Sequence, residues 1–313
     1  METLLTADPW IAAAIIRRGG IVAFPTETVY GLGANVFDER AVAKIFEAKE
    51  RPADNPLIAH VGDRSQIEEL CETINASARK LIDEFFPGPL TVVVRKSARV
   101  PLSATAGLDT IGIRMPRHEL ARNFLAACGT PVVAPSANIS GRPSPTTWQA
   151  VFEDLDGRID CILQGEATEI GLESTVVDCT GRVPVVLRSG AISIEEIRQI
   201  VPETTHFAGD VKDAAASPGM RHKHYSPRAK VVIVRDSSEA AEQGRSAFIG
   251  FEIRSAHFDK VEVCASAEEY AHRLFAFFRE CDRDKIDVIY CQKVEETGIG
   301  RALMDRLRRA AEG

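Results

Sequence analysis

The loop at residues 48–60, AKERPADNPLIAH, constrains the fold around it more than any other stretch of the chain. Before it, apolar residues at positions 41, 42, 45 and 46 have the spacing of one helix face. Pro52 disfavours a helical conformation at Arg51, so we expect this helix to end between Lys49 and Arg51. Residues 57–61, LIAHV, then predict a short strand. Pro52 and Pro56 therefore predict a rigid loop between a helix and a strand.

Four polar side chains accompany this loop, namely Lys49, Arg51, Asn55 and His60. Two cations, an amide and an imidazole on one stiff segment are suited to an anionic ligand. The alternative is a surface turn whose charges are solvated by water.

Further polar groups follow other predicted strands. Thr26 and Thr28 come after a strand at residues 21–24, and two apolar strands end on Arg114 and Arg188. A loop that displays Ser136, Asn138, Ser140 and Ser144 follows a strand at residues 131–134. The ends of strands are the usual place for ligand groups in α/β proteins. Structural alternatives remain open: the threonines as strand formers, Arg114 in an internal salt bridge, and the serines in ordinary turns.

No complete catalytic motif accompanies these groups. Gly31 and Gly33 do not complete G-x-G-x-x-G because position 36 is valine, and there is no Walker A, G-x-S-x-G, zincin or paired-carboxylate motif. Cations and hydroxyls without an evident nucleophile predict chemistry by positioning and charge stabilisation. Attack on a phosphoryl group of a nucleotide is the clearest example.

Strands and helices alternate along the chain and predict an α/β fold. We expect a first domain at residues 1–205, a linker at 206–229 and a smaller, mostly parallel α/β domain at 230–313. The linker ends in MRHKHYSP, residues 220–227, whose donors and aromatic surface favour a lid over a charged ligand. His222 and His224 lack a third metal ligand nearby. The arginines at 301, 306, 308 and 309 are expected on a solvated helix face.

Composition limits the classes of function. The 313 residues suffice for two domains, and a net charge of -7 argues against a protein that coats nucleic acid. Seven cysteines without a C-x-x-C pair predict reduced thiols and no metal or disulfide framework. The apolar run at residues 10–16 is too short for a signal peptide or a membrane span, so we expect a cytoplasmic protein without membrane contact.

Several motifs in combination resemble the YrdC-type family. They are PTETVYGLG (25–33), the Lys49 and Arg51 pair, FPGPLT (86–91), TAGLDTIGIR (105–114), APSANISG (134–141), ESTVVD (173–178) and VLRSG (186–190). The linker with HKHYSP and the domain after it resemble the two-domain branch of this family, the threonylcarbamoyl-AMP synthases. The resemblance implies a YrdC-like α/β domain with a twisted mixed sheet and a concave basic cavity, followed by a smaller Rossmann-like domain.

The activity that this resemblance implies joins L-threonine, bicarbonate and ATP into L-threonylcarbamoyl-adenylate with release of pyrophosphate, which is a nucleotidyltransferase reaction. Mg²⁺ is expected to accompany the ATP, with no ligand from protein side chains and no tightly bound organic cofactor. The product would serve a separate tRNA threonylcarbamoyl transferase, so tRNA is expected to be an indirect partner.

The resemblance also implies roles for residues at matching positions. Lys49 and Arg51 would neutralise charge during catalysis, and L-threonine would be held by Thr28, His60, Arg114 and Ser174. ATP would be surrounded by Arg51, Asn55, Thr110, Ser136, Asn138, Ser144 and Arg188, with Tyr225 of the linker closing over it. No general base is assigned.

Two other functions fit parts of the sequence. A YrdC-like fold offers a concave basic surface that could hold RNA without catalysis, although the acidic net charge counts against this. The carbamoyl-transfer enzymes of hydrogenase maturation also contain a YrdC-type domain. They carry zinc-finger and acylphosphatase segments as well, and this chain lacks the C-x-x-C pairs that such fingers require.

Overall fold

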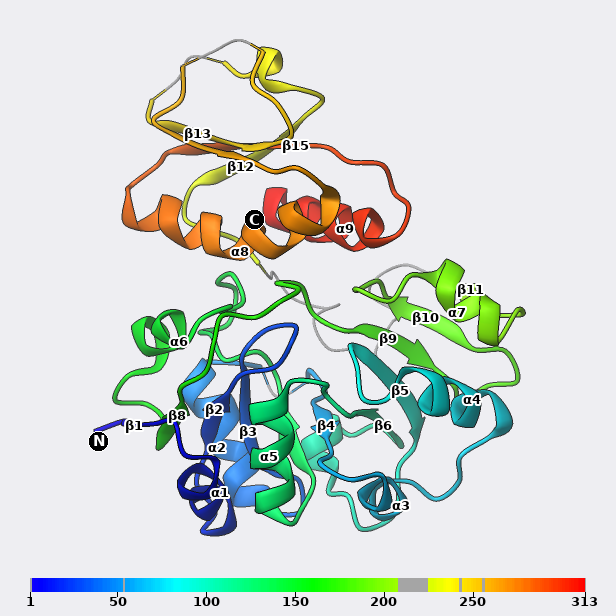
Figure 1. Ribbon diagram of the computed structural model, residues 1–313. Helices are drawn as coiled ribbons and strands as arrows, with labels where there is room; N and C mark the ends of the chain where they lie inside the picture. The colour runs from blue at the N-terminus through cyan, green and yellow to red at the C-terminus, as the bar shows by residue number, and fades with distance from the viewer. Residues whose placement is uncertain (1, 53, 208–224, 242–243, 255–256, 313) are drawn as a thin grey trace.

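The structure is a computed structural model that describes residues 2–52, 54–207, 225–241, 244–254 and 257–312. In these residues the strands form one eleven-stranded mixed sheet and one four-stranded parallel sheet, each accompanied by helices (Figure 1). The predicted α/β class, with a large mixed sheet and a smaller parallel one, is confirmed. His222 and His224 lie outside the described residues.

The first sheet is built from eleven short strands. They are β1 (Leu4–Thr6), β2 (Val22–Phe24), β3 (Gly31–Asn35), β4 (Ile58–His60), β5 (Leu90–Arg95), β6 (Thr110–Arg114), β7 (Val132–Ala134), β8 (Cys161–Leu163), β9 (Thr175–Asp178), β10 (Val185–Arg188) and β11 (Thr205–His206). Their order is β1-β8-β2-β3-β7-β4-β6-β5-β9-β10-β11. The sheet mixes parallel and antiparallel neighbours. For example, β4 is parallel to β6 but antiparallel to β7.

Helices connect these strands and cover their apolar side chains. They are α1 (Pro9–Arg17), α2 (Glu39–Lys49), α3 (Ile67–Leu70), α4 (Ala76–Phe85), α5 (Glu119–Cys128), α6 (Trp148–Leu155) and α7 (Ile194–Ile200), with 3-10 turns at Arg64–Gln66 and Leu102–Thr105. Asp8 caps α1 and Pro9 occupies its first turn, and both residue types are favoured at these positions of a helix. The predicted end of α2 is confirmed, because Glu50 takes a left-handed conformation with φ of 52°.

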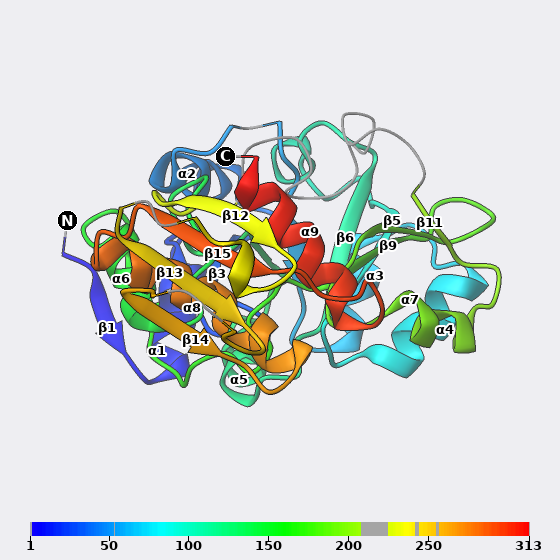
Figure 2. The same cartoon turned by 90° about the horizontal axis from the view of Figure 1, so that it is seen from above.

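The second sheet contains β12 (Lys230–Val234), β13 (Ser246–Gly250), β14 (Lys260–Val263) and β15 (Val288–Gln292). Figure 2 shows them side by side in the order β12-β15-β13-β14. A 3-10 turn at Ser237–Glu239 follows β12, and α8 (Ala267–Arg283) and α9 (Ile299–Ala311) lie between these strands and the first domain (Figure 1). Among the described helices, none combines the length and the apolar character needed to cross a membrane.

Two elements of the first domain go beyond the sequence expectation. The segment GLGAN, for which no strand was predicted, is strand β3, and its glycines allow close packing: a Cβ on Gly33 would lie 2.6 Å from Cγ1 of Val132. Helix α6 was not expected at all. It begins after Thr147, whose side chain accepts a hydrogen bond from the amide of Ala150, and it has only eight residues.

Buried contacts join the two domains. Val29 and Leu172 of the first domain share an apolar cluster with Phe275 of α8. On α9, Arg306 is fully buried and pairs with Glu173 of the first domain. The prediction of a solvated face is therefore wrong for Arg306, because α9 turns that side chain toward the first domain instead of toward water. It is correct for Arg308, whose side chain is 50% exposed.

We predict that Gly190→Ala destabilises the protein. A Cβ at this position would lie 2.3 Å from the amide nitrogen of Thr175 and 2.5 Å from the carbonyl oxygen of Glu173, so the backbone must shift. The expected loss is roughly 1–3 kcal/mol of unfolding free energy, which thermal denaturation monitored by circular dichroism would measure. Gly181→Ala is the matched control, because the nearest atom to its Cβ lies at 3.7 Å. Equal melting temperatures for the two variants would contradict the tight packing at Gly190.

Candidate functional site

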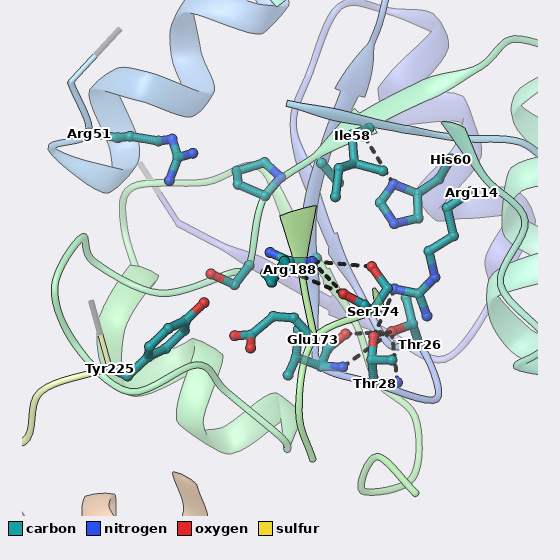
Figure 3. A pocket seen from close by; sticks show the side chains of 15 residues that line it. Thr26, Thr28, Arg51, Ile58, His60, Arg114, Glu173, Ser174, Arg188 and Tyr225 are labelled. Atoms are coloured by element: carbon teal, nitrogen blue, oxygen red, sulfur yellow. Dashed lines mark hydrogen bonds between the residues drawn. The ribbon is translucent and has the colours of Figure 1, made fainter. Parts of the chain in front are cut away.

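A hollow in the first domain gathers polar side chains from distant parts of the chain. It is lined by Thr26, Thr28, Val29, Gly31, Arg51, Ile58, His60, Arg114, Ala134, Pro135, Ser136, Glu173, Ser174, Arg188 and Tyr225. The residues that the sequence predicted for a site and that line this hollow are Thr28, Arg51, His60, Arg114, Ser136, Ser174, Arg188 and Tyr225. Figure 3 shows Arg51 and Tyr225 at one end and Arg114, His60 and Thr28 at the other.

The register of the first sheet brings several of these residues together. In the parallel pair of β4 and β6, His60 lies directly beside Arg114. In the antiparallel pair of β4 and β7, Ile58 lies beside Ala134, and the chain then continues into the loop with Ser136. Neighbouring residues on adjacent strands point to the same face of a sheet. The strand pairing therefore places the imidazole, the guanidinium and the serine loop around one space.

Arg114 belongs to a buried ion pair at one end of the hollow. Its Nη2 lies 2.8 Å from Oε1 of Glu27, and its Nη1 donates a hydrogen bond of 2.8 Å to the hydroxyl of Thr28. Burial by itself would raise the pKa of Glu27, but the charge of Arg114 outweighs it and holds that pKa below its usual value. The internal salt bridge that the sequence left open for Arg114 is thus present, and the same side chain also lines the hollow.

His60 is an uncharged member of the site. Burial, with a contribution from the nearby charge of Arg114, lowers the pKa of its imidazole to about 3. Its Nδ1 lies 3.1 Å from the carbonyl oxygen of Ile58, and its ring meets Phe24 edge-on with the ring centroids 5.7 Å apart. The ring is therefore neutral at pH 7 and can hydrogen-bond a ligand without adding charge to the hollow.

Arg188, at the end of β10, holds the segment that carries Ser174. Its Nε and Nη2 donate to the carbonyl oxygen of Ser174 over 3.1 and 3.0 Å, and Nη2 also donates to the Ser174 hydroxyl over 3.2 Å. The hydroxyl of Thr91 lies 2.8 Å from that of Ser174. Burial lowers the pKa of Arg188, but a guanidinium stays protonated in proteins. A fixed positive charge thus lies at the middle of the hollow.

Arg51 presents unused donors at the opposite end. Its side chain is buried, and its Nε and Nη2 have no hydrogen-bond partner among the described residues. Burial lowers the pKa of this guanidinium to about 10, so it remains charged at pH 7. A buried cation with unpaired N–H groups is costly unless a ligand accepts from it. Arg51 therefore indicates the position of an anionic group.

Lys49 lies below this surface and outside the lining. Its ammonium donates to the carbonyl oxygens of Ser136 and Asn138, and burial together with the charge of Arg51 lowers its pKa well below the usual value. Asn138 accepts from the Ser136 hydroxyl over 2.5 Å and donates to two carbonyls of its own loop. Both residues shape the loop that carries Ser136. Their direct roles in catalysis and in ATP binding stay predictions.

Three further predicted ATP-binding residues also lie outside the lining. Ser144 donates a hydrogen bond of 2.5 Å to Oε1 of Glu173. Thr110 is the first residue of β6 and pairs with Arg95, at the opposite end of the strand from Arg114. Asn55 is buried in the loop after α2. None of the three lines the hollow, although Ser144 contacts Glu173 of its lining, and their contacts with ATP stay predictions.

Sequence reasoning missed two carboxylates of the site, Glu27 and Glu173. Each stands next to a residue that was predicted to bind the substrate, Thr28 and Ser174 respectively, and each lies within a motif of the resemblance, PTETVYGLG and ESTVVD, but neither was given a role. Their partners are arginines far along the chain, which only the fold brings close.

The chemistry of the hollow follows from this inventory. Three guanidinium groups, of Arg51, Arg114 and Arg188, are arranged along it with hydroxyls between them. Within the described residues no three His, Cys, Asp or Glu side chains are grouped to hold a metal ion, and arginines engage both Glu27 and Glu173. The arrangement can therefore bind an extended anionic ligand, or two anionic ligands side by side.

The chain is similar to known proteins over nearly its whole length. A family model for Sua5, YciO and YrdC proteins, described as telomere recombination, matches residues 14–190, and a model described as the threonylcarbamoyl-AMP synthase C-terminal domain matches residues 192–312. A threonylcarbamoyl-AMP synthase of Pyrococcus abyssi is 47% identical, over 96% of this chain and 93% of the relative. One of Bacillus subtilis is 42% identical, over 100% and 96%. The crystal structure of Pyrococcus abyssi Sua5 complexed with L-threonine has a TM-score of 0.92 and 44% identity, over 99% of this chain and 97% of that one.

We predict that Glu27→Gln lowers the unfolding free energy by roughly 3 kcal/mol at pH 7, because it leaves the charge of Arg114 buried without its counter-ion. The folded-state pKa of Glu27 lies below its ordinary value of 4.5. The stability that ionised Glu27 contributes is therefore fully present above pH 4.5, and it is lost as the pH falls through the folded-state pKa of Glu27. Urea titrations of the wild type and of Glu27→Gln between pH 7 and pH 3 would measure both unfolding free energies. The difference between them should shrink as the pH falls.

The control for this measurement is Asp83→Asn, which removes an exposed ion pair with Arg64. We expect it to cost less than about 1 kcal/mol at pH 7. A Glu27→Gln variant that is as stable as this control at pH 7 would show that the buried pair adds nothing to stability.

Proposed function

The chain belongs to the Sua5, YciO and YrdC family in the two-domain form of the threonylcarbamoyl-AMP synthases, and from this membership we propose that it joins L-threonine, bicarbonate and ATP into L-threonylcarbamoyl-adenylate and pyrophosphate. The reaction makes the protein a nucleotidyltransferase. Its product is the substrate of a separate tRNA threonylcarbamoyl transferase, so tRNA is an indirect partner. A relative of nearly the same fold has been crystallised with L-threonine, which supports threonine as one substrate.

One observation carries the proposal: the guanidinium groups of Arg51, Arg114 and Arg188 line a single hollow. Isolated surface arginines would each face water, and an RNA-binding surface would spread its cations over an open face. Here the three groups are buried and lie around a confined space. This arrangement suits a compact pair of ligands that carries a carboxylate and a triphosphate.

The threonine end is the group of Thr28, His60, Arg114 and Ser174. Arg114 pairs with Glu27 and donates from Nη1 to Thr28, and its Nε and Nη2 make no hydrogen bond among the described residues, so they can donate to a carboxylate. His60 is neutral, and the hydroxyls of Thr28 and Ser174 are already oriented by protein partners. These groups would select a small amino acid that has both a carboxylate and a hydroxyl.

The nucleotide end is the region of Arg51 and Arg188, with Ser136 and Tyr225 nearby. ATP would enter as its Mg²⁺ complex, in which the ion is held by phosphate oxygens and water, since Glu27 and Glu173 are both engaged by arginines. The ion would neutralise phosphate charge. Arg51 would add its unpaired N–H groups to the phosphates, and Tyr225 would cover the nucleotide.

Chemically, the amine of threonine first forms a C–N bond to the carbon of bicarbonate, which gives a carbamate and releases water. An oxygen of the carbamate then attacks the α-phosphorus, and the bond from that phosphorus to the departing pyrophosphate breaks in line. The chain would orient the two reactants and stabilise the charge that grows on the phosphates. No side chain is assigned as a general base.

The direct test is pyrophosphate release by purified protein, with L-threonine, bicarbonate and ATP each withheld in turn. The proposal requires release to depend on all three. Release that is indifferent to threonine and bicarbonate would overturn it. Salt-sensitive RNA binding without any turnover of ATP would instead support a non-catalytic RNA-binding module.

A mutational prediction follows from the unpaired donors of Arg51. Arg51→Ala removes a phosphate contact that becomes strongest as charge develops, so we expect kcat/KM for ATP to fall at least about tenfold, or roughly 1.4 kcal/mol. Arg95→Ala is the control, because that side chain is exposed and pairs with Asp109 on the surface. If Arg51→Ala turned over at the rate of this control, Arg51 would have no part in the reaction.

A further inference from the structure

Arg306 is a residue of the second domain that reaches the edge of the hollow. It lies on α9 and is fully buried. Its Nε donates to Oε2 of Glu173 over 2.9 Å, and its Nη2 donates to the carbonyl oxygen of Ser189 over 3.2 Å. Its guanidinium carbon also lies 5.2 Å from the centroid of the Tyr225 ring. One side chain thus contacts three segments that line or adjoin the site.

Each of those contacts adjoins a residue with a proposed role. Glu173 precedes Ser174, Ser189 follows Arg188, and Tyr225 lines the nucleotide end. The other oxygen of Glu173 accepts from the hydroxyl of Ser144. Arg306 therefore holds the backbone and the carboxylate on which the middle of the hollow is built.

The contact between Arg306 and Glu173 also affects the electrostatics of the hollow, because Glu173 carries a negative charge. A carboxylate that lines a hollow meant for a triphosphate repels the ligand unless a cation neutralises it. Burial by itself would raise the pKa of Glu173, but Arg306 foremost and then Arg188 hold it below the usual value, so the group is ionised. The main counter-charge therefore comes from the second domain.

We propose that Arg306 is a positioning residue for the reaction, which completes the nucleotide end of the site from the second domain by neutralising Glu173 and holding it away from the phosphates. The inference rests on the proposed function. It gives the second domain a defined part in the chemistry: docking of α9 is what makes the hollow favourable for ATP.

The chain contains a matched comparison. Arg279 of α8 is also buried, also crosses between the domains and pairs with Asp154 of α6 over 2.8 Å. Neither Arg279 nor Asp154 lines the hollow. A purely structural role would make Arg279 and Arg306 equivalent, since both hold the domains together through a buried ion pair.

The experiment measures steady-state pyrophosphate release by the full-length protein, varying MgATP and L-threonine separately. Arg306→Gln should raise KM for ATP at least about tenfold, because a charge left unpaired in a ligand site weakens binding strongly, and should change KM for threonine less than about threefold. Arg279→Gln should lower the melting temperature about as much as Arg306→Gln does, because both variants break a buried ion pair between the domains. It should leave KM for ATP within about twofold of the wild-type value.

A charge-matched double variant separates neutralisation from docking. Arg306→Gln combined with Glu173→Gln removes both charges, and it should recover most of the lost affinity for ATP. Arg306→Lys keeps the charge and should stay within about threefold of the wild type in KM for ATP. This variant also serves if Arg306→Gln does not fold, which circular dichroism would reveal.

The outcomes divide clearly. A selective rise in KM for ATP that Glu173→Gln rescues supports the inference. Two results would overturn the inference: equal rises in KM for ATP in Arg306→Gln and Arg279→Gln without rescue by Glu173→Gln, or a tenfold loss of ATP affinity in a folded Arg306→Lys. In either case, turnover by the wild-type protein would leave the proposed function standing. A wild-type protein that releases no pyrophosphate from the three substrates would overturn the proposed function itself, and the inference with it.

Discussion

The partnering of buried guanidinium groups is the constraint on which this structure depends. An arginine removed from water needs an anion or carbonyls, and in this chain the partners come from distant segments: Glu27 for Arg114, the Ser174 backbone for Arg188, and Glu173 for Arg306. These pairings hold the loops around the hollow in one arrangement. Arg51 differs, because among the described residues no ion pair accompanies the two of its nitrogens that lack a hydrogen-bond partner, whereas Arg114 has Glu27 beside it. Its donors are left for a ligand.

The same principle joins the domains. An apolar cluster in which Leu172 meets Phe275 supplies contact area, and two buried ion pairs, Arg306 with Glu173 and Arg279 with Asp154, make the contact specific. A cation that is buried only when the domains are docked disfavours other relative positions, since undocking exposes one charge and leaves its partner inside. The second domain thus forms one unit with the wall of the site.

Sequence patterns predicted much of the architecture correctly where local chemistry determines it. Asp8 caps α1, Pro52 ends α2, and the strand that ends on Arg114 lies where its apolar run indicated. The failures have local reasons as well. Strand β3 is rich in glycine, which is poor in strand propensity and acceptable here only because Phe24 and Val132 pack against it. Helix α6 directly follows a stretch rich in serine and proline at residues 135–147, which is typical of turns.

The sequence by itself predicted which residues would form a site, because polar groups after strands and the motifs around them are local features. Thr28, Arg51, His60, Arg114, Ser136, Ser174, Arg188 and Tyr225 were all identified in this way, and all of them line the hollow. Only the tertiary structure decided how they are used. It placed Lys49 beneath a loop, gave Arg114 the counter-ion Glu27, and turned Arg306 from an expected surface residue into the partner of Glu173. Charge pairing depends on distance in space, and strand register and domain docking set that distance without any mark in the local sequence.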